Sequence, residues 1–129
     1  MSIAVELSNL ADALARYRFA YLMTASANEG APHAVAVSPR LQDGALWIDG
    51  AGRRTRDNAA QRPAVGLVWP PAVESDYSLI VDGQAAVDGE RLRITPTRAV
   101  LHRPAPARPT APGRCGADCV ELELGAAAP

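Results

Sequence analysis

Three arginines and a threonine occupy four consecutive positions, 53 to 56, directly after a glycine-rich turn. The surrounding pattern predicts, in order, a strand at 46–48, a turn at 49–52, a helix at 53–61 and a strand at 65–69. The first turn of a helix exposes unpaired N–H groups and carries partial positive charge, so it favours anions over cations. Both the N–H and the guanidinium groups would stabilise a bound anion. We therefore expect Arg53, Arg54 and Thr55 to hold a phosphate. The alternative is a solvated arginine surface in a chain without lysine.

The bulk composition restricts the class of protein. A chain of 129 residues is large enough for one core but not for two. The formal net charge of -1 provides no overall field that would attract nucleic acid or an anionic membrane surface. No apolar run is long enough to span a bilayer. Glu6 and Asp12 in the first helical pattern argue against a signal peptide, so we expect a cytoplasmic protein.

The remaining pattern is dominated by short strands. An amphipathic helix is expected at 3–18, followed by strands at 19–26, 32–37, 46–48, 65–69, 77–87 and 91–95. We expect the first three strands to form an antiparallel meander and Asp82–Gly83 to bend the long strand. The strand at 91–95 resembles an edge strand, and 96–102 is compatible with a single helical turn. Six short strands at this spacing predict a mainly β fold, a barrel or sandwich with a few helices.

The chain is expected to divide into a barrel domain at 1–102 and a proline-rich arm at 103–129. Four prolines between 103 and 113 favour extended structure outside a sheet. The run 119–124 alternates apolar and polar residues, which is compatible with a final strand that rejoins the barrel or pairs with a partner chain. Cys115 and Cys119 have neither zinc-finger nor thioredoxin spacing, so free thiols and no metal site are expected.

Three segments resemble the flavin-binding split-barrel superfamily of pyridoxamine 5′-phosphate oxidase-like proteins and deazaflavin (F420)-dependent reductases. They read PHAVAV, DGALWIDGAGRRTRDNAAQRPAVGLVWPP and YSLIVDGQAAV, within a similarity spanning about residues 8 to 95. The superfamily's corner reads roughly Ser-Arg-Lys-x-x-Asn, then Pro and an apolar strand; Arg53, Arg54, Thr55 and Asn58 occupy its places, with Pro63 following. Thr55 stands where Lys is frequent, yet its hydroxyl can donate one hydrogen bond, and Arg53 can restore the charge.

The resemblance implies a six-stranded antiparallel split barrel that forms a homodimer. It also implies that FMN, or F420 as second choice, is bound between the subunits, with its phosphate at Arg53, Arg54 and Thr55. Ser38 would hydrogen-bond the pyrimidine side of the ring, and Arg40 would face N1 and O2.

Two aromatic residues are further candidates for the cofactor site. Trp69 and Tyr77 flank a loop that approaches the flavin in the superfamily, so either could stack on the ring. Core packing at the end of the barrel is the alternative for both residues.

Three basic residues are candidate substrate contacts. His33 begins a strand and could donate a proton or contact a substrate, although lone strand histidines more often lie on the surface. His102 and Arg103 follow the last barrel strand, where related oxidases place basic groups for a substrate phosphate.

The function expected from these residues is that of an oxidoreductase. No Ser–His–Asp set, P-loop or paired-carboxylate site is evident, so the cofactor would supply the chemistry by hydride transfer with a small organic substrate. The missing lysine at the corner motivates an alternative, a non-catalytic split-barrel module that binds haem or another ligand. A structural dimer without ligand is a third possibility.

Overall fold

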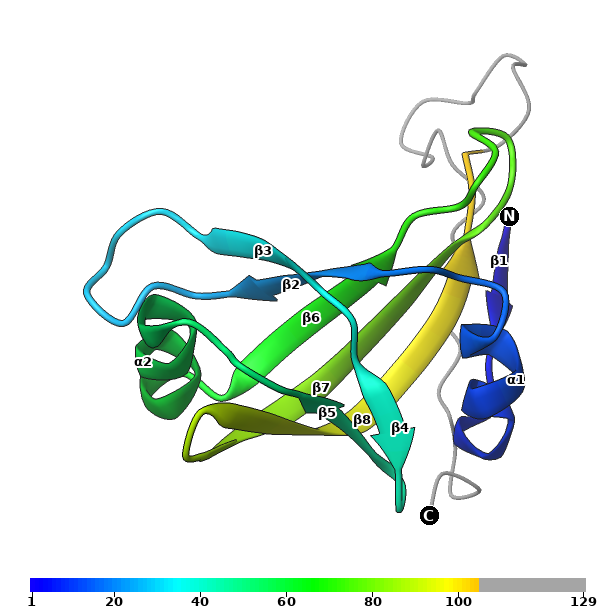
Figure 1. Cartoon of the computed structure of the whole chain (residues 1–129). Coiled ribbons are helices and arrows are strands. Elements are labelled where there is room, and N and C mark those ends of the chain that lie inside the picture. Colours follow the sequence, from blue (N-terminus) through cyan, green and yellow to red (C-terminus); the bar gives the residue numbers. More distant parts are fainter. Residues whose placement is uncertain (105–129) are drawn as a thin grey trace.

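The structure, a computed structural model, describes residues 1–104 of the chain. Its elements in chain order are β1 (Ser2–Ala4), the 3-10 turn η1 (Leu7–Asn9), α1 (Leu10–Leu14), β2 (Ala20–Thr24), β3 (His33–Val37), β4 (Arg40–Gln42), β5 (Ala45–Ile48), α2 (Arg53–Gln61), β6 (Ala64–Trp69), β7 (Ser78–Asp88) and β8 (Arg91–His102) (Figure 1). The helix predicted at 53–61 is confirmed to the residue.

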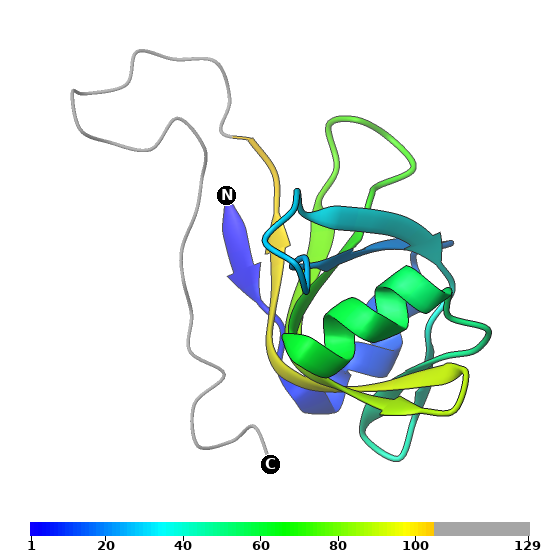
Figure 2. The same ribbon diagram turned by 90° about the vertical axis from the view of Figure 1, so that its left-hand side faces the viewer.

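One antiparallel sheet curls into a barrel that is open along one side (Figures 1 and 2). Its strand order is β3-β2-β6-β7-β8-β5-β4, and β1 pairs with the C-terminal part of β8. β3 and β4 end the order on opposite sides, although only Ser38 and Pro39 separate them in sequence. The two ends of the sheet are thus covalently joined without being paired. The expected mainly β split-barrel class is confirmed, with eight strands instead of six.

The expected meander of three strands is wrong in its third member. β2 and β3 pair as predicted, but β5 pairs with β4 and β8 and not with β3. Pro39 has no N–H with which to extend the β2–β3 ladder, and the chain turns there into the short strand β4, which the sequence pattern missed. Partners that lie far apart in sequence decide this pairing, so local patterning could not reveal it.

The expected N-terminal helix at 3–18 is too long. Ser2–Ala4 forms β1, and Met1 and Arg103 exchange backbone hydrogen bonds of 3.0 and 3.2 Å. Backbone pairing with β8 therefore overrides the helical periodicity of the first residues. Leu10 and Ala13 are buried in the helical part, whereas Ala11, which the periodicity placed on the inner face with Leu10, is exposed.

β8 is longer than expected and is not an edge strand. It continues through 96–102, where a helical turn was expected, and lies between β7 on one side and β5 and β1 on the other. Pro96 is opposite Gly83, where the register shifts after Asp82 and confirms the predicted bend. Proline is tolerated at such an irregularity because no regular ladder bond is lost there.

The core fills the inside of the curled sheet. Its largest fully buried side chains are Leu10, Leu22, Leu46, Leu67, Leu79, Leu92, Ile94 and Val81. In the part of the chain that the structure describes, no helix combines the length and apolar character needed to cross a bilayer. Residues 105–129 lie outside the described residues; these include both cysteines and the strand predicted at 119–124, so the domain division also stays a prediction.

We predict that Gly83→Ala destabilises the protein by about 1–3 kcal/mol, because overpacking forces the surrounding side chains and backbone to shift. A Cβ on Gly83 would lie 2.6 Å from Ile94 Cγ2 and 2.7 Å from the Thr95 carbonyl oxygen. Gly66→Ala is the matched control, since its nearest neighbour would be Met23 Cε at an ordinary 3.6 Å. Urea unfolding measures both variants, and equal midpoints would contradict the proposed steric constraint.

Candidate functional site

The start of α2 carries uncompensated positive charge. Its N-cap is Gly52, no side chain caps the helix, and the first turn contains no acidic residue. The side chains of Arg53 and Arg54 are exposed and form no hydrogen bond or ion pair with any other residue of the range 1–104. The free N–H groups and the two guanidinium groups together favour an anion at this position.

Thr55 provides a second, independent indication of a ligand. Its side chain is only 3% exposed and lines a cavity, and its hydroxyl has no hydrogen-bond partner among the described residues. A hydroxyl that opens onto the cavity without a protein partner remains available to a ligand. An oxygen of a ligand in the cavity would satisfy it.

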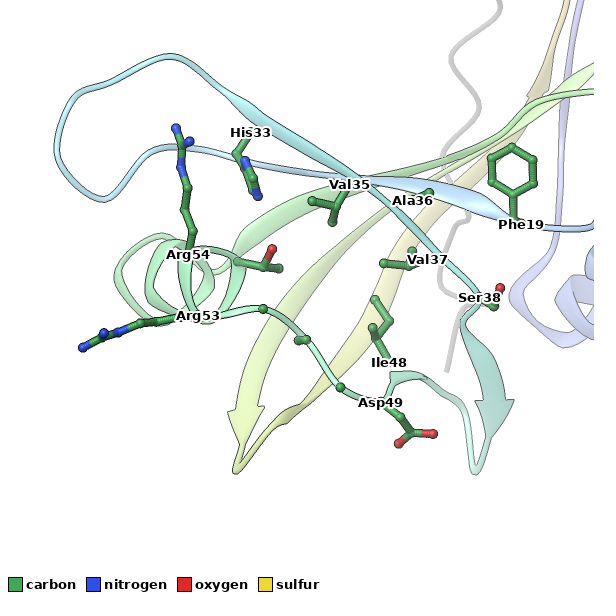
Figure 3. A pocket seen from close by; sticks show the side chains of 14 residues that line it. Phe19, His33, Val35, Ala36, Val37, Ser38, Ile48, Asp49, Arg53 and Arg54 are labelled. Atoms are coloured by element: carbon green, nitrogen blue, oxygen red, sulfur yellow. The ribbon is translucent and has the colours of Figure 1, made fainter.

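The cavity lies in the split of the barrel and has a volume of about 590 Å³. One wall is formed by β3 and Ser38, the other by the stretch 48–55, and Phe19 lines one end (Figure 3). The two walls come from opposite ends of the sheet order. The cavity therefore exists because these ends do not pair.

The lining changes in character along the cavity. Figure 3 shows Arg54 rising from α2 and His33 projecting from β3 into the same space, whereas Arg53 extends outward. Apolar side chains follow, with Val35 and Val37 from β3 facing Ile48 from β5. Ser38 and Asp49 lie beyond them. Such a cavity suits a ligand with an anionic group at one end and an apolar body.

A buried hydrogen-bond network holds α2 in place. Asn58, 3% exposed, donates from Nδ2 to Thr24 Oγ1 at 3.0 Å and accepts at Oδ1 from the Ala27 N–H at 3.0 Å. Arg62 Nε donates to the Ser26 carbonyl at 2.9 Å. Thr24 is the cross-strand partner of His33, so the network supports both walls of the basic end. Asn58 belongs to the corner motif described in the sequence, but the motif did not predict that Asn58 would position α2.

The glycine-rich turn is fixed at the other side of α2. The Ala51 N–H donates to the Glu90 carbonyl at 2.8 Å, which attaches the turn to the β7–β8 hairpin. Gly50 has a φ of 64°, a conformation that is unfavourable for residues with a side chain.

Five of the predicted site residues line this cavity: His33, Ser38, Arg53, Arg54 and Thr55. Phe19 and Asp49 also line it and were not predicted. No sequence signal distinguished them, since Phe19 reads as a strand residue and Asp49 as a turn residue.

Arg40 lies near the cavity but is engaged elsewhere. Its Nε donates to Asp49 Oδ2 at 3.2 Å, and Nη2 lies 3.2 Å from the same oxygen. The side chains of Arg40 and Asp49 are 50% and 59% exposed. This surface ion pair links the first residue of β4 to the residue that follows β5. Arg40 therefore supports the Asp49 end of the cavity without lining it.

The other predicted residues lie away from the cavity. Trp69 is only 3% exposed and belongs to the core, which leaves its ring almost no accessible surface. The Tyr77 carbonyl accepts a 2.8 Å hydrogen bond from the Tyr17 hydroxyl, whose pKa is raised by burial. The Arg103 guanidinium lies 4.7 Å from the Tyr77 ring centroid, and His102 Nδ1 lies 3.2 Å from Ser2 Oγ. Tyr77, His102 and Arg103 thus lie where β1 and β8 meet the loop before β7.

Across the described residues, no three His, Cys, Asp or Glu side chains are grouped so that they could hold a metal ion. The lining also offers no carboxylate–histidine pair at its basic end. The arrangement can bind and orient an anionic ligand.

Several solved structures share the architecture of this chain. A protein of Listeria innocua described as a candidate pyridoxamine 5′-phosphate oxidase superposes with a TM-score of 0.60 at 13% identity, covering 74% of this chain and 96% of its own. An FAD-binding protein of Mesorhizobium loti gives 0.61 at 13% identity, with 78% and 96% covered. An F420 reductase gives 0.55 at 16% identity, with 67% and 91% covered. The chain therefore has the fold of these proteins, in agreement with the fold that the sequence resemblance implied.

Two mycobacterial proteins are much more similar in sequence. Uncharacterized proteins of Mycobacterium bovis and Mycobacterium tuberculosis are each 44% identical over 137 aligned positions, which cover 93% of this chain and 96% of theirs. The chain belongs to the same family as these two proteins. No protein-family model matches the sequence.

We predict that Asn58→Leu lowers the free energy of unfolding by about 1–3 kcal/mol, because the Ala27 N–H and the Thr24 hydroxyl lose their buried partner. Thr24→Val removes one of these bonds from the other side. The double variant should therefore cost less than the sum of the single variants in urea unfolding. Additive costs would show that the network does not act as a unit.

Proposed function

We propose that the protein is an oxidoreductase that binds FMN in the cavity and transfers a hydride between the flavin and a small organic substrate. The observation that carries this proposal is the uncapped, arginine-bearing start of α2, which opens into an elongated cavity beside the unpartnered Thr55 hydroxyl. This arrangement provides donors for a phosphate at one end only. The apolar middle of the cavity provides a surface for a ring system.

The residues fit such a cofactor in a simple division of roles. Arg53, Arg54 and the first N–H groups of α2 would bind the phosphate, with the Thr55 hydroxyl as a further donor. Val35 and Ile48 would exclude water from the ring, and Ser38 offers a hydroxyl at the far end. The bound flavin supplies the redox chemistry, while the protein binds and orients it.

The structural neighbours support a cofactor of this kind. One of them is described as FAD-binding and another as an F420 reductase, and both share this fold. F420 is therefore the alternative cofactor. Either would carry its phosphate to the same basic end, so the two are distinguished by direct titration.

We further propose that the active form is a homodimer with a site completed by the second subunit. Tyr21 and Met23 on the outer face of β2 and Phe19 directly before the strand form an alternating row, and they are 44%, 38% and 36% exposed. The Phe19 and Tyr21 rings form an edge-to-face pair with centroids 5.3 Å apart. Beside this apolar row lie small exposed residues of β3, including Ala36.

This outer face is continuous with the cavity, because Phe19 and Ala36 also line it. A row of large side chains beside a row of small ones can interlock with a copy of itself about a two-fold axis. A second subunit on this face would therefore bury the aromatic pair and extend the cavity wall.

We predict that the purified protein is yellow or binds added FMN or F420, and that Arg53→Ala/Arg54→Ala weakens this binding by about 2–4 kcal/mol through the loss of two charge-assisted contacts. Fluorescence titration measures the affinity, and the visible spectrum of the protein as purified identifies a bound flavin or a haem. The matched control is Arg91→Ala/Arg93→Ala, which removes the same charge from exposed positions that do not line the cavity.

Failure of both FMN and F420 to bind at tens of micromolar would exclude the flavin assignment. Flavin binding that survives the loss of Arg53 and Arg54 would exclude the start of α2 as the phosphate site. A haem spectrum would instead favour the non-catalytic binding module.

We predict that Tyr21→Glu converts the dimer into a monomer, because the introduced carboxylate would be buried without a partner at the interface. Sedimentation velocity at micromolar concentration measures the change, and flavin affinity should fall with it. Val73→Glu is the control, since Val73 is 56% exposed in the loop between β6 and β7. A monomeric unmodified protein would contradict the dimer and a site built from two chains.

A further inference from the structure

His33 faces the basic end of the cavity from the opposite wall. It is the first residue of β3, is partly buried, and points into the space toward which Arg54 rises from α2 (Figure 3). Its imidazole forms no hydrogen bond or ion pair with the other residues that the structure describes. Thr55, whose hydroxyl also has no partner among the described residues, lies in the same lining. Donors from two separate elements therefore converge on one part of the cavity.

The charged residues that share the cavity lining with His33 are Arg53, Arg54 and Asp49. α2 contributes Arg53 and Arg54 to the lining, and the neighbouring strand β2 places the uncharged Thr24 opposite His33. The only carboxylate in the lining, Asp49, lies at the other end and is paired with Arg40.

Two further carboxylates lie near these elements without lining the cavity. Glu29 is exposed in the turn before β3, and Asp57 is exposed on α2. A protonated imidazole at position 33 would thus adjoin cations, and its charge would be compensated only when an anion occupies the cavity.

We propose that His33 is a pH-dependent part of the anion site, which in its protonated form binds the phosphate from β3 while Arg53 and Arg54 bind it from α2. This inference rests on the proposed function, because it assigns a further residue and a regulation to the same site. Binding of an oxyanion is then coupled to the uptake of one proton by His33. No covalent bond changes, and the proton comes from the solvent.

A geometric consequence is that the anion bridges the two walls of the split. β3 ends the sheet and is paired only with β2, whereas α2 is fixed independently by the Asn58 network. Contacts from both walls to one phosphate would tie the free edge of β3 to α2. Low pH would strengthen this connection, because histidine gains its proton in the range below neutrality.

The test uses the full-length protein and inorganic sulfate, whose charge does not change over the pH range used. Proton NMR follows the two histidines, His33 and His102, between pH of about 5.5 and about 8, where imidazoles titrate. We expect saturating sulfate to move the midpoint of the His33 titration upward and to leave that of His102 unchanged, since His102 lies beside Ser2, outside the cavity. A displacement by one pH unit corresponds to about a tenfold change in sulfate affinity across the titration.

Calorimetric titration provides the second measurement. Sulfate affinity of the unmodified protein should rise several-fold as the pH falls through this range, and His33→Gln should abolish the rise while His102→Gln retains it. An unmoved His33 midpoint, together with sulfate binding that still requires Arg53 and Arg54, overturns the inference and leaves the proposed function intact. If neither sulfate nor FMN binds the unmodified protein, both the inference and the proposed function are wrong.

Discussion

Gly83 and Pro96 face each other in the long β7–β8 hairpin, where a side chain on residue 83 would collide with Ile94 and the backbone of Thr95. The register shift at this point bends the hairpin and increases its twist. β8 can therefore pair with β5 before the bend and with β1 after it. The curl of the whole sheet depends on this bend, and so does the approach of its two ends.

The split in the barrel gives the cavity its chemical asymmetry. Since the ends of the sheet do not pair, one wall consists of the free edge of β3 and the other of a loop and the start of a helix. Only the helix start offers several N–H groups and guanidinium groups together, so positive charge collects at one end. The buried Asn58 network keeps this end rigid, because each of its polar groups has a partner close to 3.0 Å away.

Much of the fold could be predicted from local signals. The 53–61 helix follows from its glycine-rich turn and Pro63, and the bend at Asp82–Gly83 follows from a polar–glycine pair within an apolar strand. The continuation of β8 through Pro96 could not be predicted, because proline normally ends a strand and only the facing glycine makes it tolerable. The short strand β4 was missed because its three residues form a strand only through pairing with β5.

The part of the candidate site that lies within one short stretch of sequence, the start of α2, was predictable. Arginines at a helix start are recognisable in the sequence because the helix dipole and the free N–H groups act on adjacent residues. The sequence by itself thus determined the arginine-bearing helix start and the strand-rich class of the fold. Only the tertiary structure decided that His33 and Ser38 share a cavity with this helix start, and that Arg40, Trp69 and Tyr77 lie outside it. The physical reason is that strand pairing and sheet curvature bring together residues that are distant in sequence, and no local pattern encodes those distances.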